Sequence, residues 1–232
     1  MEKNERPFFS FSSEKRKMKQ IAIKQIPTNI KNESLVKKRR QQIFEAAMKL
    51  FPQKGYHSTT LREISKETGI TLGNLYDYIS TKEDILYIIQ ERATQAVIEA
   101  ISTNQDETCG PLEKLRRLIN SELDMVDKYQ DMILIIYQES HAWSKELLQT
   151  SLENEGRHVE QYEKVIAEGI KKGVFKGTNA RMLANMVIML INTWVLRRWD
   201  LGARIKIKEM RQCILETVFN GIVNDDLKAI SI

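Results

Sequence analysis

Hydrophobic residues recur at helical spacing along nearly the whole chain, from about Leu35 to Gly221, and this pattern restricts the fold more than any other feature. Apolar residues three or four positions apart form one stripe along a helix, whereas a strand needs apolar and polar residues in strict alternation. No part of the chain alternates for long enough to indicate a strand. We therefore predict an all-α protein.

The sequence favours neither a membrane span nor a metal site. The longest stretch without a charged residue, Met182 to Leu196, has 15 residues, whereas a membrane-spanning helix needs about 20. We interpret it as a buried helix. Cys109 and Cys213 are isolated and do not lie at zinc-binding spacings, which favours a reducing compartment. We expect a cytoplasmic protein with no metal, no cofactor and no membrane partner.

Positive charge is concentrated in the first third of the chain. Residues 1–33 carry a net charge of +4 and residues 34–82 carry +5, whereas residues 83–232 carry −4. A basic region on a mildly acidic body is typical of a protein that binds a polyanion. Nucleic acid is the partner that this favours, and an anionic membrane surface is the alternative.

The N-terminal residues, 1–36, look like a basic extension. They lack the apolar core of a secretory signal, so we expect a disordered leader. Its basic run at Lys15, Arg16, Lys17 and Lys19 offers the alternative of non-specific contacts with phosphates. Met18 is an alternative translation start.

The first predicted helix runs from about Ser34 to Phe51, with an apolar face opposite a basic one. Pro52 lacks a backbone donor and Gly55 follows it, so we expect the helix to end there.

The next segment predicts two short helices joined by a tight turn. Thr60 and Glu63 have the spacing of a capping box, in which each side chain bonds the other residue's amide. Gly69 can take the left-handed conformation that ends a helix. Thr71 can then cap a second helix over Leu72 to Tyr78. Two short helices around such a turn form a helix-turn-helix at 60–79.

The second helix of such a motif enters the DNA major groove. We expect Asn74 to contact adenine, Leu72 a thymine methyl group, and Gly73 to allow close backbone approach. Other side chains are suited to phosphates. The predicted DNA-binding residues are Lys38, Thr60, Thr71, Leu72, Gly73, Asn74, Tyr76 and Lys82. The alternative is a two-helix corner that only redirects the chain.

Several motifs between Arg39 and Ile89 occur together. They are Ile43-Phe44-Glu45-Ala46-Ala47, Leu50-Phe51, Gly55-Tyr56, Thr59-Thr60, Ile64, Gly69-Ile70-Thr71, Gly73-Asn74-Leu75-Tyr76-Asp77-Tyr78 and Lys82-Glu83-Asp84. In these motifs the chain resembles the TetR family of bacterial transcriptional regulators. The resemblance implies a three-helix DNA-binding domain at 37–97, a larger helical domain at 98–232 that binds a small effector, and a homodimer on a palindromic operator.

The sequence departs from the family pattern at a few positions. Pro52, Ser65 and Thr68 stand where the family more often has alanine, so we expect altered packing between the first two helices. Leu72 stands where many members have a polar or basic residue, which changes the expected base preference.

The helices after the helix-turn-helix are predicted at 82–102, 112–126, 131–140, 144–172, 179–200 and 206–223. The last two are the most apolar, which indicates a four-helix interface between subunits, although burial within one subunit is the alternative. The candidate interface residues are Leu190, Trp194, Leu215, Val218 and Phe219.

Adaptable methionine and aromatic side chains suit a lipophilic effector, although each could equally belong to the core. The candidate pocket residues are Met125, Tyr129, Tyr137, His141, Met186, Met189 and Trp194. The segments 137–139, 169–175 and 194–199 are similar to a branch of the family that controls fatty-acid or acyl-CoA metabolism. In that branch Arg197 or Arg198 would meet an acyl-CoA phosphate or a carboxylate, although the interpretation that we favour for this pair is solvated charge at a helix end.

Catalytic motifs are lacking. The histidines form no HExxH motif, and the sequence contains neither a glycine-rich phosphate loop nor a GxSxG serine motif. We therefore expect no enzyme but a dimeric repressor released from its operator by a small lipophilic effector, such as an acyl-CoA or a fatty acid. The alternatives are a regulator of an efflux or stress gene that responds to aromatic or drug-like compounds, and an architectural DNA-binding protein without an effector.

Overall fold

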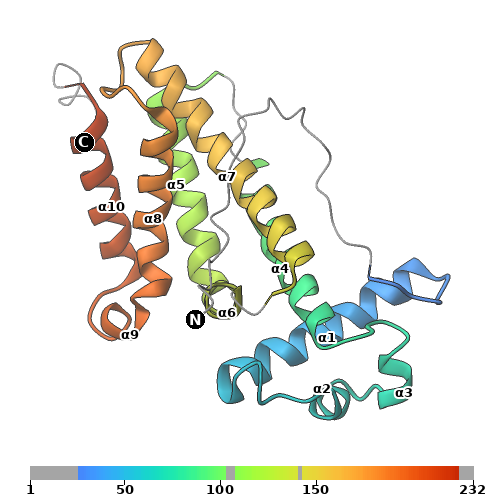
Figure 1. The fold of residues 1–232 in the computed structure, drawn as a ribbon. Coiled ribbons are helices and arrows are strands. Elements are labelled where there is room, and N and C mark those ends of the chain that lie inside the picture. Colours follow the sequence, from blue (N-terminus) through green and yellow to red (C-terminus); the bar gives the residue numbers. More distant parts are fainter. Residues whose placement is uncertain (1–25, 103–107, 141–142, 225–232) are drawn as a thin grey trace, which may run out of the picture.

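The computed structural model describes residues 26–102, 108–140 and 143–224. Within these ranges the chain forms ten helices and no strand, apart from one isolated bridge between Phe175 and Val223 (Figure 1). The prediction of an all-α protein is confirmed. The helices are α1 (Glu33–Lys54), α2 (Leu61–Thr68), α3 (Leu72–Leu75), α4 (Glu83–Ser102), α5 (Pro111–Lys128), α6 (Gln130–Glu139), α7 (Lys145–Lys171), α8 (Ala180–Leu196), α9 (Arg198–Leu201) and α10 (Ile207–Ile222).

Helix α1 continues through Pro52, so the prediction that this proline ends the helix is wrong. Proline has a helical φ, and inside a helix it removes one backbone hydrogen bond and crowds the carbonyl four residues earlier; α1 accommodates Pro52 and runs for two more residues. The helix ends instead at Gly55, which has φ 82° and whose amide donates to the Phe51 carbonyl at 2.8 Å.

Residues 26–36 are packed against the protein. The Ile26 side chain is buried, and helix α1 starts at Glu33, where the Asn32 side chain accepts a hydrogen bond from the Leu35 amide at 3.1 Å. The prediction of a disordered leader is therefore wrong for residues 26–36. Residues 1–25, with the alternative start at Met18, lie outside the described residues.

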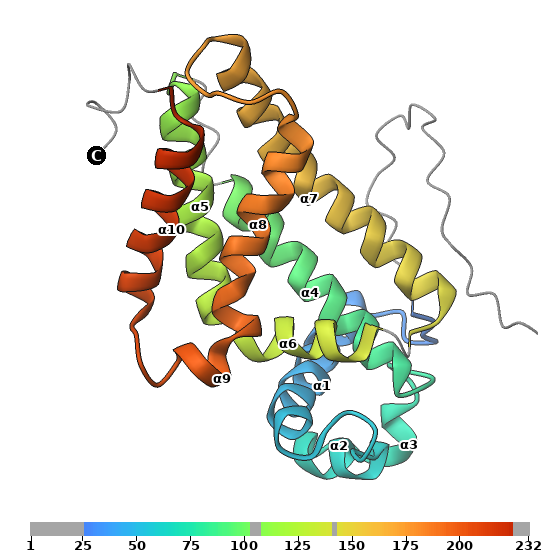
Figure 2. The ribbon, with the colours of Figure 1, turned by 60° about the vertical axis from the view of Figure 1, so that its left-hand side comes forward.

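Two separate clusters of buried side chains hold the fold together. The first joins α1, α2 and α3 to the first half of α4, to α6 and to the start of α7, where Trp143 and Leu147 contribute. The second joins α5, α7, α8 and α10. Figure 2 shows α4 running from the helix-turn-helix into the larger body, with α6 crossing beside α4 and α1. The predicted boundary at residue 97 therefore falls within a helix shared by both parts.

The larger body follows the predicted helices with one change. The helix expected over 179–200 is broken at Arg197, which has φ −111° and separates α8 from α9. Among the described residues, no helix combines the length and apolar character needed to cross a membrane.

Candidate DNA-binding surface and ligand cavity

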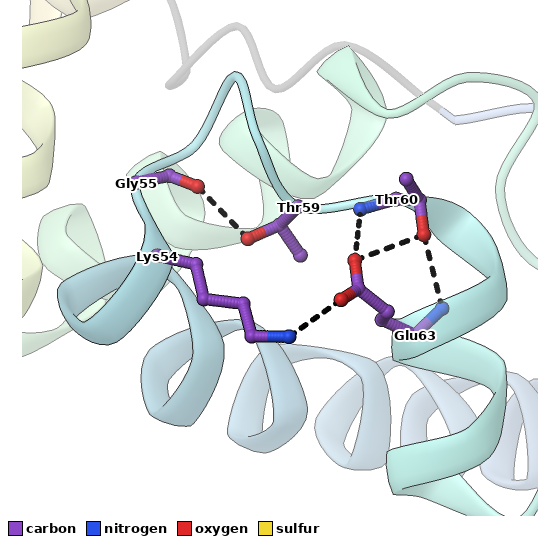
Figure 3. Close-up of polar contacts among 5 residues, drawn as sticks. All are labelled: Lys54, Gly55, Thr59, Thr60 and Glu63. Atoms are coloured by element: carbon purple, nitrogen blue, oxygen red, sulfur yellow. Dashed lines mark hydrogen bonds and ion pairs between the residues drawn. The ribbon is translucent and has the colours of Figure 1, made fainter.

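The start of α2 is fixed by the predicted capping box (Figure 3). The Thr60 amide donates to Glu63 Oε2 at 2.8 Å, and the Glu63 amide donates to Thr60 Oγ1 at 3.3 Å. Lys54 Nζ also lies 2.6 Å from Glu63 Oε1, and these hydrogen bonds, that of Lys54 first, lower the pKa of Glu63 to about 2. Thr59, to which the sequence assigned no structural role, is buried and donates to the Gly55 carbonyl at 2.8 Å. The loop between α1 and α2 is thus held at both ends.

The turn between α2 and α3 also has the predicted conformation. Gly69 has φ 69° and ψ 7°, in the left-handed region that favours glycine. Ser65 Oγ donates to the Ile70 carbonyl at 2.6 Å, and Thr68 Oγ1 accepts from the Ile70 amide at 3.2 Å. Two departures from the family pattern therefore add hydrogen bonds to the turn.

Helix α3 is shorter than predicted. Thr71 caps it by accepting from the Asn74 amide at 3.3 Å, but the helix ends at Leu75. From Tyr76 to Tyr78 each amide bonds a carbonyl three residues earlier, the tighter 3₁₀ pattern that is common at helix ends.

The side chains of this short helix divide between the core and solvent. Leu72 is half-buried against the first core, whereas Gly73, Asn74 and Tyr76 are exposed, and Tyr76 keeps 53% of its surface. Lys38 is exposed on α1, and Thr60 and Thr71 are exposed at the two helix starts. The predicted set thus combines residues on α1, α2 and α3 that a ligand can reach.

Lys82 has a different environment from the one we expected. Its Nζ donates to the carbonyls of Tyr56, His57 and Thr59 at 2.9, 3.0 and 3.1 Å, and it lies 4.5 Å from the centre of the Tyr56 ring. An ammonium group has three N–H donors, and the loop occupies all of them. Lys82 therefore stabilises the α1–α2 loop, and we remove it from the phosphate contacts.

Among the described residues, polar contacts connect the DNA-binding part to the end of α6 and to Ser144, just before α7. His57 Nε2 lies 3.1 Å from an oxygen of Glu139, the last residue of α6. The Ser144 amide donates to Glu83 Oε1 at 2.9 Å, and Ser144 Oγ lies 3.1 Å from the Tyr87 hydroxyl. The α1–α2 loop therefore contacts Glu139, and the first turns of α4 contact Ser144.

A cavity of about 540 Å³ lies between α4, α5, α6, α7 and α8. Apolar side chains form most of its wall, among them Val97, Met125 and Ile136. Ile98, Tyr137 and Leu152 also line it and are among the few large hydrophobic side chains that keep more than a third of their surface exposed. Its size and lining suit a lipophilic ligand.

One side of the cavity carries a polar cluster. Glu122 Oε2 accepts from the Tyr162 hydroxyl at 2.6 Å and lies 2.9 Å from His158 Nε2. Burial alone would lower the pKa of His158, but the charge and hydrogen bond of Glu122 raise it to about 9. Burial raises the pKa of Tyr137 to about 12, and the Tyr137 hydroxyl accepts from Asn192 at 3.0 Å. The cavity wall thus carries an imidazole in contact with a carboxylate that raises its pKa.

The predicted pocket residues are only partly brought together. Met125 and Tyr137 line the cavity, whereas Tyr129, Met186, Met189 and Trp194 do not. Tyr129 packs against the first core, and His141 lies outside the described residues.

The two arginines proposed for an anionic group do not reach the cavity either. Arg198 pairs with Asp131 at 2.6 Å, and Arg197 lies 4.8 Å from the centre of the Trp199 ring.

Three of the five predicted interface residues are buried within the chain itself. Trp194 donates its indole N–H to Asp127 at 2.8 Å, and Val218 and Phe219 are each 4% exposed. Leu190 and Leu215 are half-buried beside the second core. The prediction is therefore wrong for Trp194, Val218 and Phe219, because they fill the space between helices of one subunit.

The outer face of α8 exposes a different set of apolar side chains. Met182, Met186 and Met189 keep 57%, 57% and 50% of their surface, and their spacing places them on one side of the helix. We call these three residues the methionine stripe.

Residues 43–87 match the model of bacterial regulatory proteins of the tetR family, and residues 108–222 match the tetracyclin repressor-like C-terminal domain. Together the two matches span more than half of the chain. The chain belongs to the TetR family. As a member of that family it is a DNA-binding transcriptional regulator.

Relatives of this TetR-family chain are moderately similar to it. The HTH-type transcriptional regulator HbdR of Aromatoleum sp. (strain CIB) is 26% identical over 188 residues, which cover 81% of each chain. The fatty acid metabolism regulator protein of Bacillus subtilis (strain 168) is 26% identical over 190 residues, covering 79% of this chain and 95% of the relative.

A solved structure, AibR in complex with isovaleryl coenzyme A and operator DNA, superposes with a TM-score of 0.68 at 20% identity. It covers 79% of this chain and 97% of AibR, and supports the fold.

Proposed function

We propose that this chain is a cytoplasmic homodimeric repressor, without enzymatic activity, that leaves a palindromic operator when a small lipophilic molecule fills the cavity. The observation that carries the proposal is the position of the cavity. The end of α6 borders the cavity through Tyr137, and the part of the chain between α6 and α7 borders it through Ser140 and Trp143. The same segment contacts the α1–α2 loop and the first turns of α4 through Glu139 and Ser144. A ligand that displaces this segment would therefore also move the contacts that hold the helix-turn-helix.

The ligand releases the protein from DNA because it binds one of two protein conformations more tightly than the other. A ligand can shift an equilibrium only by the difference in its affinity for the two states. The DNA-bound state fixes the separation of the two α3 helices in the dimer, because the half-sites of an operator lie about one helical turn apart. A ligand that fits the cavity better when α6 has moved favours the other separation and so weakens DNA binding.

We propose DNA contacts for those residues of the predicted set whose side chains or backbone are accessible. Asn74 reads a base edge, Leu72 contacts a thymine methyl group with the part of its side chain that remains accessible, and Gly73 lets the backbone approach the groove. Lys38, Thr60, Thr71 and Tyr76 bind phosphates. The dimer forms through α8 and α10, with the methionine stripe, Leu190 and Leu215 against a second copy.

An acyl-CoA or a fatty acid is the effector that we favour. The cavity wall is largely apolar, and the named relatives include a fatty acid metabolism regulator and a protein bound to isovaleryl coenzyme A. A cavity of about 540 Å³ suits the acyl part, so we expect the nucleotide of an acyl-CoA to extend outside. The polar cluster around Glu122 then faces the carbonyl end of the acyl chain.

Aromatic or drug-like compounds are the alternative effectors, because Tyr137 and Trp143 line the same cavity. Under that alternative the chain controls an efflux or stress gene. An architectural DNA-binding protein without an effector is the remaining alternative, and the presence of the cavity disfavours it.

The test begins by selecting duplexes that the full chain binds from a random-sequence library. Fluorescence anisotropy on the selected duplex then measures release by acyl-CoAs and fatty acids of increasing chain length and by aromatic compounds. We expect acyl compounds to weaken DNA binding at least tenfold. The variant Ala93→Phe fills the cavity from α4 and should abolish this response, whereas Ala167→Phe, at an exposed position on α7, should retain it. No release by any compound, or equal release from both variants, contradicts the proposal.

A further inference from the structure

Two buried polar atoms in residues of the cavity wall have no hydrogen-bond partner among the described residues. They are Oε1 of Gln90 and Nε1 of Trp143. Both residues line the cavity, and they are 8% and 9% exposed. A buried indole N–H group usually finds an acceptor, and a buried polar group without a partner costs stability. These two residues therefore mark a place where a ligand can supply the missing hydrogen bonds.

One hydrogen bond between α4 and the chain before α7 brings the two residues to the same end of the cavity. The Tyr87 hydroxyl lies 3.1 Å from Ser144 Oγ. Gln90 follows Tyr87 by three positions, which places both on the same side of α4, and Trp143 directly precedes Ser144. Figure 2 shows the start of α7 beside the first half of α4.

This end of the cavity lies far from the polar cluster around Glu122. His158, which contacts Glu122, comes thirteen residues after Lys145, the first residue of α7. A helix rises about 1.5 Å per residue, so about 20 Å of α7 separates the two ends. Leu148 and Leu152 line the cavity between them. The cavity therefore has polar groups at two ends, and an elongated ligand can reach both.

The missing hydrogen bonds specify the ligand group that fits beside Gln90 and Trp143. An indole N–H group only donates, so Trp143 needs an acceptor, whereas the oxygen of Gln90 needs a donor. A hydroxyl group supplies both, because it has one O–H donor and two lone pairs. A ketone only accepts, and a carboxylate would also place a charge beside two uncharged side chains in a buried site.

We propose that the effector carries a hydroxyl group at the end opposite its acyl carbonyl, and that Gln90 and Trp143 bind this hydroxyl. This inference rests on the proposed function and narrows its effector class to hydroxylated acyl compounds. With the carbonyl end at the Glu122 cluster, an extended acyl chain places its other end beside Gln90 and Trp143. A compound without the hydroxyl leaves both buried atoms unpaired and so binds more weakly.

The two residues also lie where a ligand can act on the DNA-binding domain. Trp143 belongs to the first core, and the next residue, Ser144, donates its amide to Glu83 in the first turn of α4 at 2.9 Å. Gln90 lies on the same helix as Glu83. A hydroxyl that bonds both Gln90 and Trp143 therefore acts on the contact between α4 and the start of α7.

The competing explanation is that Gln90 and Trp143 bond each other after a small movement of their side chains. One of them lacks a donor and the other lacks an acceptor, so they are chemically complementary. In that case the two residues contribute to stability and do not select the ligand. The variants below separate the two explanations.

The test compares matched acyl-CoAs on the full chain, with the duplex selected above. Octanoyl-, dodecanoyl- and hexadecanoyl-CoA are each compared with a counterpart that carries a hydroxyl on the last carbon and with one that carries a ketone on the carbon before it. Fluorescence anisotropy gives the concentration that releases half of the DNA. For the chain length that fits best, we expect the hydroxylated compound to act at about tenfold lower concentration than the other two.

Trp143→Phe and Gln90→Leu remove the donor and the acceptor and keep similar side-chain volumes. The ratio of the half-release concentrations of plain and hydroxylated compounds is taken within each variant, so that a change in DNA affinity does not affect it. We expect each variant to lower this ratio to about threefold or less, since one hydrogen bond is lost. Gln161→Leu makes a matched substitution at the other end of the cavity wall and should keep the ratio. If Trp143→Phe does not fold, Gln90→Leu retains the test.

A second measurement observes the contact without DNA. NMR of the indole N–H groups resolves the three tryptophans of the chain, and Trp143→Phe identifies the resonance of Trp143. The hydroxylated compound should shift this resonance downfield, because the indole then donates a hydrogen bond. The plain compound should lack this downfield shift.

Equal release by plain and hydroxylated compounds would overturn the inference, and so would stronger release by the ketone or a preference that both variants retain. A loss of stability in both variants with an unchanged preference would show that Gln90 and Trp143 bond each other. A downfield shift of Trp143 without release from DNA would support the hydroxyl contact and contradict the proposed function. Neither a shift nor release by any compound would contradict both.

Discussion

Glu122 shows how one residue can combine structural and functional roles. It lies on the apolar stripe of α5 between Leu118 and Val126, and its carboxylate is only 5% exposed. A buried carboxylate needs partners to compensate for the loss of water, and His158 and Tyr162 supply them. These contacts satisfy the buried carboxylate, and Glu122 and His158 also form part of the cavity wall.

The protonation of His158 predicts a pH-dependent stability. Its pKa is about 9 in the folded chain, compared with about 6.5 in an unfolded one, so the folded state binds the proton more tightly. The stabilisation is complete below pH 6.5 and is lost as the pH rises through 9. It amounts to at most about 3 kcal/mol.

Urea unfolding of the unaltered chain and of His158→Gln measures this effect. Glutamine retains a donor for Glu122 but does not titrate between pH 6 and 9. Glu122, Glu155 and Tyr162, the titratable groups that act on His158, remain in both proteins. We expect the stability advantage of the unaltered chain to shrink across this range. Parallel pH curves would show that the imidazole does not carry the extra proton.

Substitution of Gly73 tests DNA recognition separately from protein stability. A Cβ atom at this position would meet no other atom within 4 Å, and alanine is the better helix former by about 1 kcal/mol. Gly73→Ala should therefore keep or slightly raise the stability of the protein in urea. It should weaken binding to the selected duplex by about tenfold if the backbone approaches the groove closely. Unchanged DNA affinity would remove Gly73 from the proposed contact surface.

Sequence reasoning succeeded for residues whose role is set by near neighbours in the chain. Thr60, Gly69 and Thr71 cap helices through atoms within three residues, so spacing alone predicted them. Lys82 and Trp194 were misassigned because their partners lie 23 or more residues away in the chain. Glu122 could have been found, because a charged residue on an otherwise apolar stripe indicates a buried partner.

Helix α6 is the element that connects the ligand cavity to the DNA-binding domain. It contributes Met132 and Ile135 to the first core and Ile133 and Ile136 to the cavity wall. Its last residue, Glu139, faces His57 of the α1–α2 loop at 3.1 Å and is 15% exposed. Burial lowers the pKa of Lys82, and Glu139 partly opposes this effect. Movement of α6 therefore changes the electrostatic support of the loop that precedes α2.

Glu139→Gln tests this connection. The change removes the charge opposite His57, so we expect the effector to weaken DNA binding about threefold less than in the unaltered chain, as a smaller coupling free energy predicts. DNA affinity without effector should change less than twofold. Glu160→Gln on α7 is the matched control. If both variants respond like the unaltered chain in the anisotropy assay, the Glu139 contact does not transmit the signal.

The boundaries of the elements were predictable to within a few residues where caps define them, as at α2, α4 and α7. Helix α3 ended early and the predicted 179–200 helix broke at Arg197, and neither position carries a glycine or proline that would have signalled the end in the sequence. The packing of α6 against α1 was not predicted either, since periodicity shows that a helix has an apolar face but not which helix covers it.

On the scale of the whole molecule, the exposed apolar surface predicts how two copies meet. The methionine stripe lies on the outer face of α8, next to α10, and an exposed apolar row of this kind is typical of a subunit interface. Three of the originally predicted interface residues are internal, because burial within the chain and burial between chains produce the same hydrophobic pattern in a sequence.

Met186→Asp combined with Met189→Asp should separate the dimer, because two carboxylates per chain would be buried at the interface. Sedimentation equilibrium should then give the mass of one chain, 27.0 kDa. Binding to the palindromic duplex should fall by at least a hundredfold. Gln53→Asp, at an exposed position on α1, is the control and should stay dimeric. A double variant that remains dimeric would place the interface elsewhere.

The first hydrophobic core has a consequence for exchanging domains between relatives. It includes side chains from α6 and from Trp143 and Leu147, far beyond the end of the helix-turn-helix in sequence. A chimera joined at residue 97 would pair the DNA-reading helices of one parent with the α6 of another, and would inherit a mismatched core. Operator specificity is therefore better transferred between relatives by exchanging a few surface side chains on α3 than by exchanging a block of sequence.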